Sequence, residues 1–277
     1  PYPIIIMKYF FISFFSTALV ASLAAYDFDF TSSEGFTGPG GVALNGQQGW
    51  TATAGIFVNA DAGKEFLFLN GGNQNAQHSE SFDPNAGTMT MSADFRFSAS
   101  PTVSSDIFNV FKLVDTSGDP GDIARVYFRY GTAQDDFRIR YSTGNGFDRN
   151  ILNTNVFTKA QIGLDDNDTT DDLRLTWTFT KGADATSWST TISLYNITTS
   201  TDIDLSYTPG NTYENSSVTV TSAFNGYNSI ESGFVTSGIT SGNILAYSTS
   251  VVPETSTYAL IFGGVLFGYV MIRRRKA

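Results

Sequence analysis

The sequence predicts an all-β fold, a single antiparallel β-sandwich built by the central part of the chain. Short segments alternate strictly between apolar and polar residues, clusters of Gly, Asn, Asp and Ser separate them, and no stretch of ten or more body residues has a helical period. Such alternation is typical of a strand with one buried and one solvated face. Many short strands separated by turns indicate a sandwich or jelly roll. Because composition does not shift along the body, we predict one domain over residues 26–250.

Five segments carry the strand pattern most clearly. They are residues 89–97, 107–114, 126–130, 137–141 and 173–179. Residues 107–114 are apolar on both faces except at Asn109 and Lys112, which is typical of a central strand. Turns are predicted between the segments, at residues 131–135, 144–146, 165–172 and 181–184.

The first 25 residues have the layout of a secretory signal peptide. Met7 and Lys8 precede an apolar run that ends at Leu23, and small residues follow, so cleavage is expected after Ala24 or Ala25. Residues 1–6 precede this candidate start. The apolar run is short for a membrane span, which favours a cleaved signal helix over an N-terminal anchor.

Residues 251–277 form a three-part tail. It begins with the segment Val252, Pro253, Glu254 and Thr255. An apolar run of 15 residues, 258–272, follows and is expected to be helical; roughly 17–25 residues are needed to span a membrane comfortably. The tail ends in the basic cluster Arg273, Arg274, Arg275 and Lys276. Because basic clusters stay on the cytoplasmic side, we expect a stop-transfer segment that inserts transiently or permanently, with the body exported.

This tail closely resembles the PEP-CTERM sorting signal of Gram-negative bacteria. Pro253 and Glu254 match its motif, and Thr255 stands where a second proline is usual. The resemblance covers only the tail. It implies processing by a membrane exosortase and delivery to the cell envelope, outer surface or extracellular matrix. A permanent C-terminal anchor is the alternative.

Composition excludes several function classes. Without the two targeting ends the body keeps 11 basic and 25 acidic residues, a net charge of −14, so nucleic acid is not an expected partner. The chain has no cysteine, which excludes disulfides and a cysteine nucleophile. Its one histidine, His78, excludes a histidine zinc cluster. His78 lies in a polar segment and is predicted to be a solvated loop residue.

The start of the body resembles concanavalin-like (lectin/glucanase, laminin-G-like) jelly rolls. The resemblance rests on Phe28-Asp29-Phe30 and on the segment from Leu44 to Trp50. It implies that the first and last strands pair, the last one including residues 244–247. It also implies a body that binds or scaffolds glycan without catalysis.

No catalytic residue is predicted. Glycosidases of this fold use two neighbouring carboxylates, and the Glu-x-Asp-x-Glu strand pattern of the laminarinase-like branch is absent. The body's glutamates are scattered, at Glu34, Glu65, Glu80, Glu214 and Glu231. A glycan hydrolase or lyase with dispersed carboxylates is the enzymatic alternative, and a matrix protein without a specific ligand is the structural one.

The densest carboxylate cluster, residues 165–172, is a candidate calcium site. Its candidate ligands are Asp165, Asn167, Asp168 and Asp171. Calcium takes six to eight oxygen ligands, but the EF-hand spacing fails because its glycine position falls on Thr170 and its final glutamate on Thr176. The alternative is a solvated turn, since Asp and Asn are natural turn residues. No other cofactor is predicted.

A cationic stripe is the second candidate site. It consists of Arg125, Tyr127, Arg129, Arg138 and Arg140, which would share one face of a hairpin turning at residues 131–135. Guanidinium groups pair with carboxylate or sulfate, so an acidic extracellular polysaccharide is the predicted partner. Ordinary cross-strand pairing with aspartates is the alternative.

Overall fold

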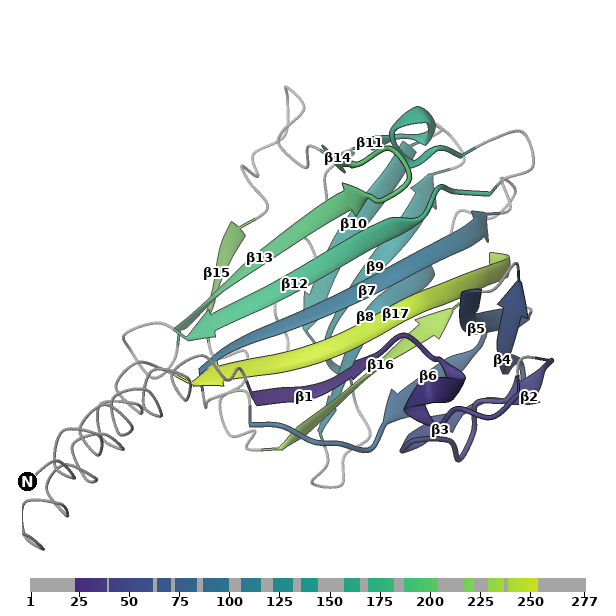
Figure 1. The fold of residues 1–277 in the computed structure, drawn as a ribbon. Coiled ribbons are helices and arrows are strands. Elements are labelled where there is room, and N and C mark those ends of the chain that lie inside the picture. Colours follow the sequence, from purple (N-terminus) through teal and green to yellow (C-terminus); the bar gives the residue numbers. More distant parts are fainter. Residues whose placement is uncertain are drawn as a thin grey trace, which may run out of the picture.

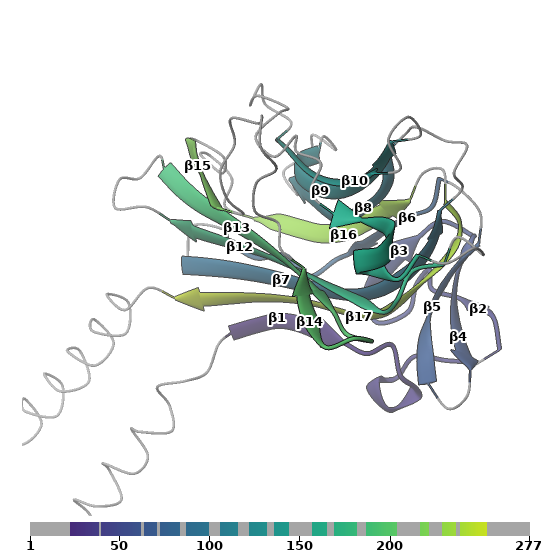
Figure 2. The ribbon, with the colours of Figure 1, turned by 90° about the horizontal axis from the view of Figure 1, so that it is seen from above.

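The chain folds as a two-layer antiparallel β-sandwich, which confirms the predicted fold class (Figures 1 and 2). The computed structural model describes residues 23–38, 40–61, 64–70, 73–83, 87–99, 106–115, 122–131, 136–143, 157–164, 169–181, 187–203, 217–221, 229–236 and 239–253. Every strand pair within these residues is antiparallel. The helices in this part of the chain are two short 3₁₀ turns, Ser32–Glu34 and Lys159–Ile162.

Sheet A is the larger layer. Its strands lie in the order β14-β13-β12-β7-β17-β5-β4-β2, with β1 also paired to β17 and β15 to β13. They are β1 (Leu23–Phe28), β2 (Val42–Ala43), β4 (Ile56–Asp61), β5 (Lys64–Asn70), β7 (Gly87–Ala99), β12 (Leu173–Lys181), β13 (Ser187–Asn196), β14 (Thr201–Ile203), β15 (Ser217–Thr221) and β17 (Ile239–Pro253).

Sheet B is the second layer, in the order β11-β10-β9-β8-β16-β6-β3. Its strands are β3 (Trp50–Ala52), β6 (Asn75–His78), β8 (Asp106–Asp115), β9 (Asp122–Gly131), β10 (Asp136–Thr143), β11 (Phe157–Thr158) and β16 (Ile230–Thr236). All five predicted strand segments are therefore strands. The apolar segment 107–114 forms β8, an internal strand between β9 and β16, as its pattern predicts.

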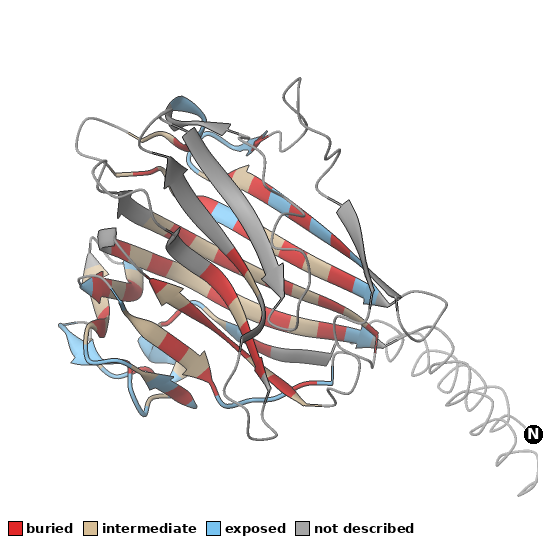
Figure 3. Ribbon diagram, turned by 180° about the vertical axis from the view of Figure 1, so that it is seen from behind, coloured by how far each residue is buried: buried red, intermediate tan, exposed pale blue. Residues whose placement is uncertain are grey.

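The period-2 pattern explains which side of each strand faces the core. In β12 the apolar residues Leu173, Leu175, Trp177 and Phe179 are buried, while the threonines and the arginine between them are half-buried or exposed. β7 and β13 alternate in the same way, as the burial colours show (Figure 3). Burying one apolar face of each sheet against the other supplies the main stabilising term of the fold.

Aromatic side chains fill the space between the sheets. Trp50 of β3 lies 5.7 Å from Tyr247 of β17 and 5.8 Å from Phe234 of β16, measured between ring centroids. Phe111 of β8 continues the cluster, 5.7 Å from Tyr247 and 6.1 Å from Trp177 of β12. Trp50, Phe234 and Phe111 come from sheet B, and Tyr247 and Trp177 from sheet A, so these contacts join the two layers.

The first and last strands pair, as the concanavalin-like resemblance implies. β1 lies antiparallel to β17, with Leu23 opposite Val251 and Phe28 opposite Tyr247. β1 begins at Leu23 and β17 ends at Pro253, so both strands extend beyond the predicted domain limits of 26 and 250. The start of the sandwich and its end therefore lie side by side at one end of sheet A (Figure 1).

Most of the two predicted targeting ends lies outside the described residues. Residues 1–22, Glu254, Thr255, the apolar run 258–272 and the basic cluster 273–276 all belong to that part. Val252 and Pro253 of the predicted sorting motif are the last residues of β17, paired with Thr88 and Gly87 of β7. In the described part of the chain, no helix has the length and apolarity that crossing a membrane requires.

Candidate functional site

The β9–β10 hairpin brings the five residues of the predicted cationic stripe into register. Arg129 is directly opposite Arg138, Arg140 is opposite Tyr127, and Arg125 is opposite Ser142. Cross-strand partners in a sheet lie on the same face, so the backbone places all five positions on one face of the hairpin, as predicted. The side chains of Tyr127, Arg129, Arg138 and Arg140 are outside the described part of the structure.

The described neighbours show that this face is the outer one. Val126, between two stripe positions, is fully buried, whereas Arg125 is half-buried. On β8, Phe111 and Leu113 are likewise buried while Lys112 between them is half-buried. We call the positions Arg125, Tyr127, Arg129, Arg138, Arg140 and Lys112 the cationic face of sheet B.

Lys112 is the member of this face that sequence reasoning missed. Its position in β8 is directly opposite Arg125 of β9. The sequence does hold a signal, because a lysine within a largely apolar strand must extend its long side chain to the solvated side. Asn109 is opposite Tyr127, and Asp106 is opposite Arg129, so β8 brings one carboxylate to the cationic face.

The cationic face continues as a polar row across the rest of sheet B. Gly233 of β16 is opposite Lys112 on one side and Gln77 of β6 on the other, and Gln77 is opposite Thr51 of β3. Gln77 donates through Nε2 to a carboxylate oxygen of Glu231. Glu231 is opposite Val114, two residues along β16 from Gly233, and is therefore the diagonal neighbour of Lys112 on this face.

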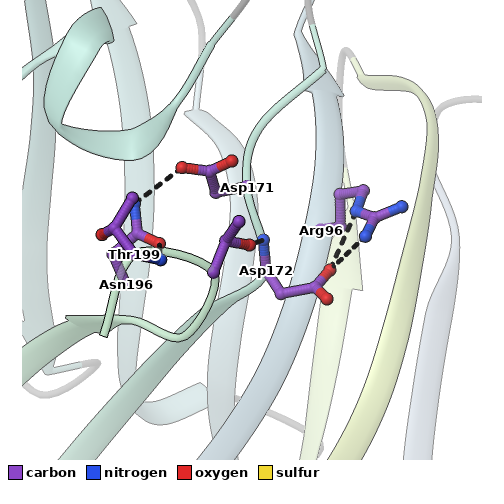
Figure 4. A network of polar contacts seen from close by, with 6 residues as sticks. Arg96, Asp171, Asp172, Asn196 and Thr199 are labelled. Carbon is purple, nitrogen blue, oxygen red and sulfur yellow. Dashed lines mark hydrogen bonds and ion pairs between the residues drawn. The ribbon is translucent and has the colours of Figure 1, made fainter. Parts of the chain in front are cut away.

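Most of the predicted calcium site lies outside the described residues. Asp165, Asn167 and Asp168 lie outside them, and Asp171 is the candidate ligand that can be placed. Its Oδ2 accepts a hydrogen bond of 2.8 Å from Nδ2 of Asn196 (Figure 4). No group of three or more His, Cys, Asp or Glu side chains suited to a metal occurs among the residues that the structure places.

The same hydrogen-bond network connects the residues before β12 to the end of β13, the second 3₁₀ turn and β7. Asn196 is buried, donates also to the carbonyl oxygen of Gln161 at 3.1 Å, and accepts from the backbone N–H of Thr199 at 3.0 Å. Asp172 forms an ion pair with Arg96 of β7, at 2.6 Å from Nη2 and 2.9 Å from Nε (Figure 4). The described carboxylates of this cluster therefore have a structural role, which favours the turn interpretation for Asp171 and Asp172.

The body's described glutamates also serve local structure. The Glu34 carboxylate accepts from the backbone N–H groups of Asp29 and Thr31, at 2.9–3.1 Å, and so caps the first 3₁₀ turn. Glu65 accepts from the backbone N–H and hydroxyl of Ser32. Burial and the nearby Glu34 raise the pKa of Asp29, and burial raises the pKa of Glu80.

The prediction of a solvated His78 is wrong. The ring is 4% exposed and lies between the sheets, 4.1 Å from the ring of Tyr26 and 5.3 Å from that of Trp50. Its Nδ1 accepts from the backbone N–H of Glu80 at 3.2 Å, so Nε2 carries the proton and donates to the carbonyl oxygen of Gln48 at 2.9 Å. The neutral ring is thus satisfied on both nitrogens.

Acid should destabilise the fold through His78. Burial lowers the pKa of His78 below its ordinary value of 6.5, so the unfolded chain binds the proton at a higher pH than the folded chain does. The stabilising contribution is complete above the unfolded pKa of 6.5 and is lost as the pH falls below it. We expect wild type to lose more unfolding free energy than His78→Phe does between about pH 7.5 and about pH 5.5. Equal losses in urea titrations of both proteins would contradict this assignment.

Comparison with known proteins identifies no family for this chain. No protein-family model matches it, and no curated protein matches it. Among solved structures, the VIP36 exoplasmic/lumenal domain, in a Ca2+/Man3GlcNAc-bound form, has 9% sequence identity and a TM-score of 0.45 over 76% of this chain and 89% of that one.

Two plant lectins are similar to the same extent. The lectin from Bauhinia forficata, in complex with GalNAc, has 10% identity and a TM-score of 0.47 over 84% of this chain and 99% of that one. Lectin II from Ulex europaeus has 12% identity and a TM-score of 0.42 over 83% and 99%. With TM-scores below 0.5, these similarities carry no functional inference for this chain, whose fold is defined by its own strand pairing.

Proposed function

We propose that this chain is an exported, non-enzymatic surface protein whose sandwich binds an acidic glycan through the cationic face of sheet B. The observation that carries the proposal is that two pairs of cation positions are directly opposed on that face. Lys112 is opposite Arg125, and Arg129 is opposite Arg138. Both pairs occur in a body with a net charge of −14.

Like charges directly opposite each other in a sheet repel, and an anionic group that contacts both of them reduces this repulsion. In the described register, Asp106 is directly opposite Arg129, and Glu231 is the diagonal neighbour of Lys112. An anionic polymer lying across β8, β9 and β10 would neutralise the opposed cations. Guanidinium forks suit carboxylate and sulfate groups, and the position of Tyr127 among them suits contact with a sugar ring.

The tail supports the export half of the proposal. The tail consists of the motif at residues 252–255, the apolar run and the basic cluster. It would be processed by an exosortase or retained as an anchor. In either case it would direct the body to the envelope or matrix of a Gram-negative-type bacterium. Because β1 and β17 pair at their outer ends, both targeting segments would join the sandwich at the same end. The sheets would then project from that tethered end, which keeps the cationic face available to an extracellular polymer.

A glycan-array screen of the full-length chain in mild detergent, with calcium and with a chelator, tests the proposal. We expect retention on uronate- or sulfate-bearing glycans and weak retention on neutral oligosaccharides. The double variant Arg129→Ala/Arg138→Ala should lower the affinity about tenfold or more, because each lost guanidinium removes charge-assisted hydrogen bonds. A requirement for calcium would support the prediction that Asp165, Asn167, Asp168 and Asp171 bind this ion.

The matched control is Arg96→Ala, which removes an arginine of sheet A that pairs with Asp172. Arg96→Ala removes one positive charge, whereas the sheet B double variant removes two, and Arg96→Ala should keep the wild-type glycan affinity. Equal loss in Arg96→Ala and in the sheet B variant would mean that bulk charge, and not the cationic face, governs binding. Absence of binding to any acidic glycan would favour a matrix protein without a specific ligand.

A further inference from the structure

The outer face of sheet A carries a regular array of hydroxyl side chains. Two register rows cross β13, β12, β7 and β17, which lie side by side at the front of Figure 1. A third crosses β13, β12 and β7, and its position on β17 is the exposed Val252. The rows are Ser193-Thr176-Ser92-Ser248, Thr191-Thr178-Thr90-Ser250 and Ser189-Thr180-Thr88. All of these residues are half-buried or exposed. We call these 11 residues the hydroxyl array.

No formal charge lies within the hydroxyl array, although the body around it is strongly acidic. The charged residues of the adjoining row are paired with each other. Arg174 donates two hydrogen bonds of 2.6 Å to Asp94, from Nε and Nη2 to the two carboxylate oxygens. Asp27 of β1 flanks the array beside Ser248. The array is therefore an uncharged patch with charges only along its borders.

Strand propensity alone does not explain this composition. Threonine is favoured in strands, but serine is not among the residues enriched there, and five of the array positions are serine. A solvated face of this size ordinarily mixes charged residues of both signs. What the two residue types share is the hydroxyl group, which can donate one hydrogen bond and accept two.

The array has a two-dimensional repeat. Neighbouring strands lie about 4.8 Å apart and alternate residues about 6.7 Å apart along a strand. Within it, the Oγ1 atoms of Thr90 and Thr178 are 3.3 Å apart, and those of Thr88 and Thr180 are 3.5 Å apart. Each hydroxyl in these pairs uses one hydrogen bond, so both retain capacity for an external partner.

We propose that the hydroxyl array binds the surface of an insoluble, neutral polysaccharide. An uncharged face of donors and acceptors matches an uncharged lattice of hydroxyls better than it matches an anionic polymer. None of the array residues is aromatic, which disfavours stacking of one isolated sugar ring and favours many weak contacts with an ordered surface. Such contacts become useful when they act together on one rigid face.

This site is distinct from the cationic face, because it lies on the outer side of the opposite layer (Figure 2). A sandwich with an anionic polymer on sheet B and a neutral one on sheet A would cross-link two matrix components. Neither site depends on the other, so each has its own test.

The test is sedimentation of the full-length chain with microcrystalline cellulose and with chitin, in mild detergent. We expect wild type to bind at least one of these solids. The variant Thr90→Val/Thr178→Val should have an affinity at least about fivefold lower, because valine has the shape of threonine but lacks its hydroxyl group. Thr90→Ser/Thr178→Ser should retain binding. Arg129→Ala/Arg138→Ala should also retain it, which separates this site from the cationic face.

Urea unfolding of each variant shows whether the fold is intact, and valine's strand propensity makes loss of folding unexpected. Wild type that stays in the supernatant with both solids would overturn the proposal. Unchanged binding of the valine variant would do so too. Adsorption to ice crystals without binding to either polysaccharide would also overturn it, since the ordered partner would then be water.

Discussion

Replacing Trp177 with alanine is expected to lower the free energy of unfolding by about 3–5 kcal/mol, among the largest effects of any single substitution in this chain. The Trp177 side chain is fully buried and lies 4.5 Å from the ring of Phe179 and 6.1 Å from that of Phe111 in the opposite sheet. Its Nε1 donates to Oγ1 of the buried Thr190 at 2.6 Å. Alanine leaves both a cavity between the layers and an unpaired hydroxyl.

Urea titration followed by far-ultraviolet circular dichroism measures this loss. The control is Trp177→Phe, which keeps most of the volume and removes the hydrogen bond to Thr190, so it should cost about 1–3 kcal/mol. If alanine and phenylalanine cost the same, packing between the sheets contributes little at this position. A loss below about 1 kcal/mol for alanine would contradict the burial of Trp177 altogether.

Gly233→Ala is the second substitution with a large expected effect, about 1–3 kcal/mol. A Cβ at Gly233 would lie 2.1 Å from the backbone carbonyl oxygen of Ala76 and 2.8 Å from Cα of Gln77. β16 and β6 would have to move apart, since backbone atoms cannot rotate away as a side chain can. The carbonyl of Gly233 also accepts from the Tyr247 hydroxyl at 2.8 Å, so the shift would strain a buried contact with sheet A.

Gly55→Ala is the matched control for this glycine. A Cβ there would meet the side-chain amide of Gln74, which has rotatable bonds, so the loss of stability should be less than half that of Gly233→Ala. Both variants are compared by urea titration under the same conditions. Equal losses would indicate that the close approach of β6 and β16 is not what requires glycine at position 233.

The sequence predicted the sandwich well where local pattern decides the structure. The alternation in β7 and β12 identified their buried faces residue by residue, because a pleated strand between core and solvent leaves no other arrangement. The apolar run at 107–114 likewise indicated the internal strand β8. The pairing of β1 with β17 followed from a family resemblance, since residues over 200 positions apart leave no local signal of their contact.

The sequence did not predict features that depend on register between distant segments. His78 looks solvated because its neighbours are polar, yet β6 turns it inward beside Tyr26 and Trp50. The contact of Asp171 with Asn196, 25 residues later, likewise has no local signal in the sequence. The hydroxyl array was also missed, because its rows exist only once β13, β12, β7 and β17 are set side by side.

The central claim is that sheet B binds an acidic glycan through its cationic face, and the salt dependence of the affinity tests it most directly. The dissociation constant of the full-length chain for its preferred acidic glycan is measured from about 50 mM to about 500 mM NaCl. We predict at least about tenfold weaker binding at high salt, and a distinctly shallower dependence in Arg129→Ala/Arg138→Ala. A dissociation constant that does not change with salt, or one whose dependence is the same in the variant, would contradict the claim.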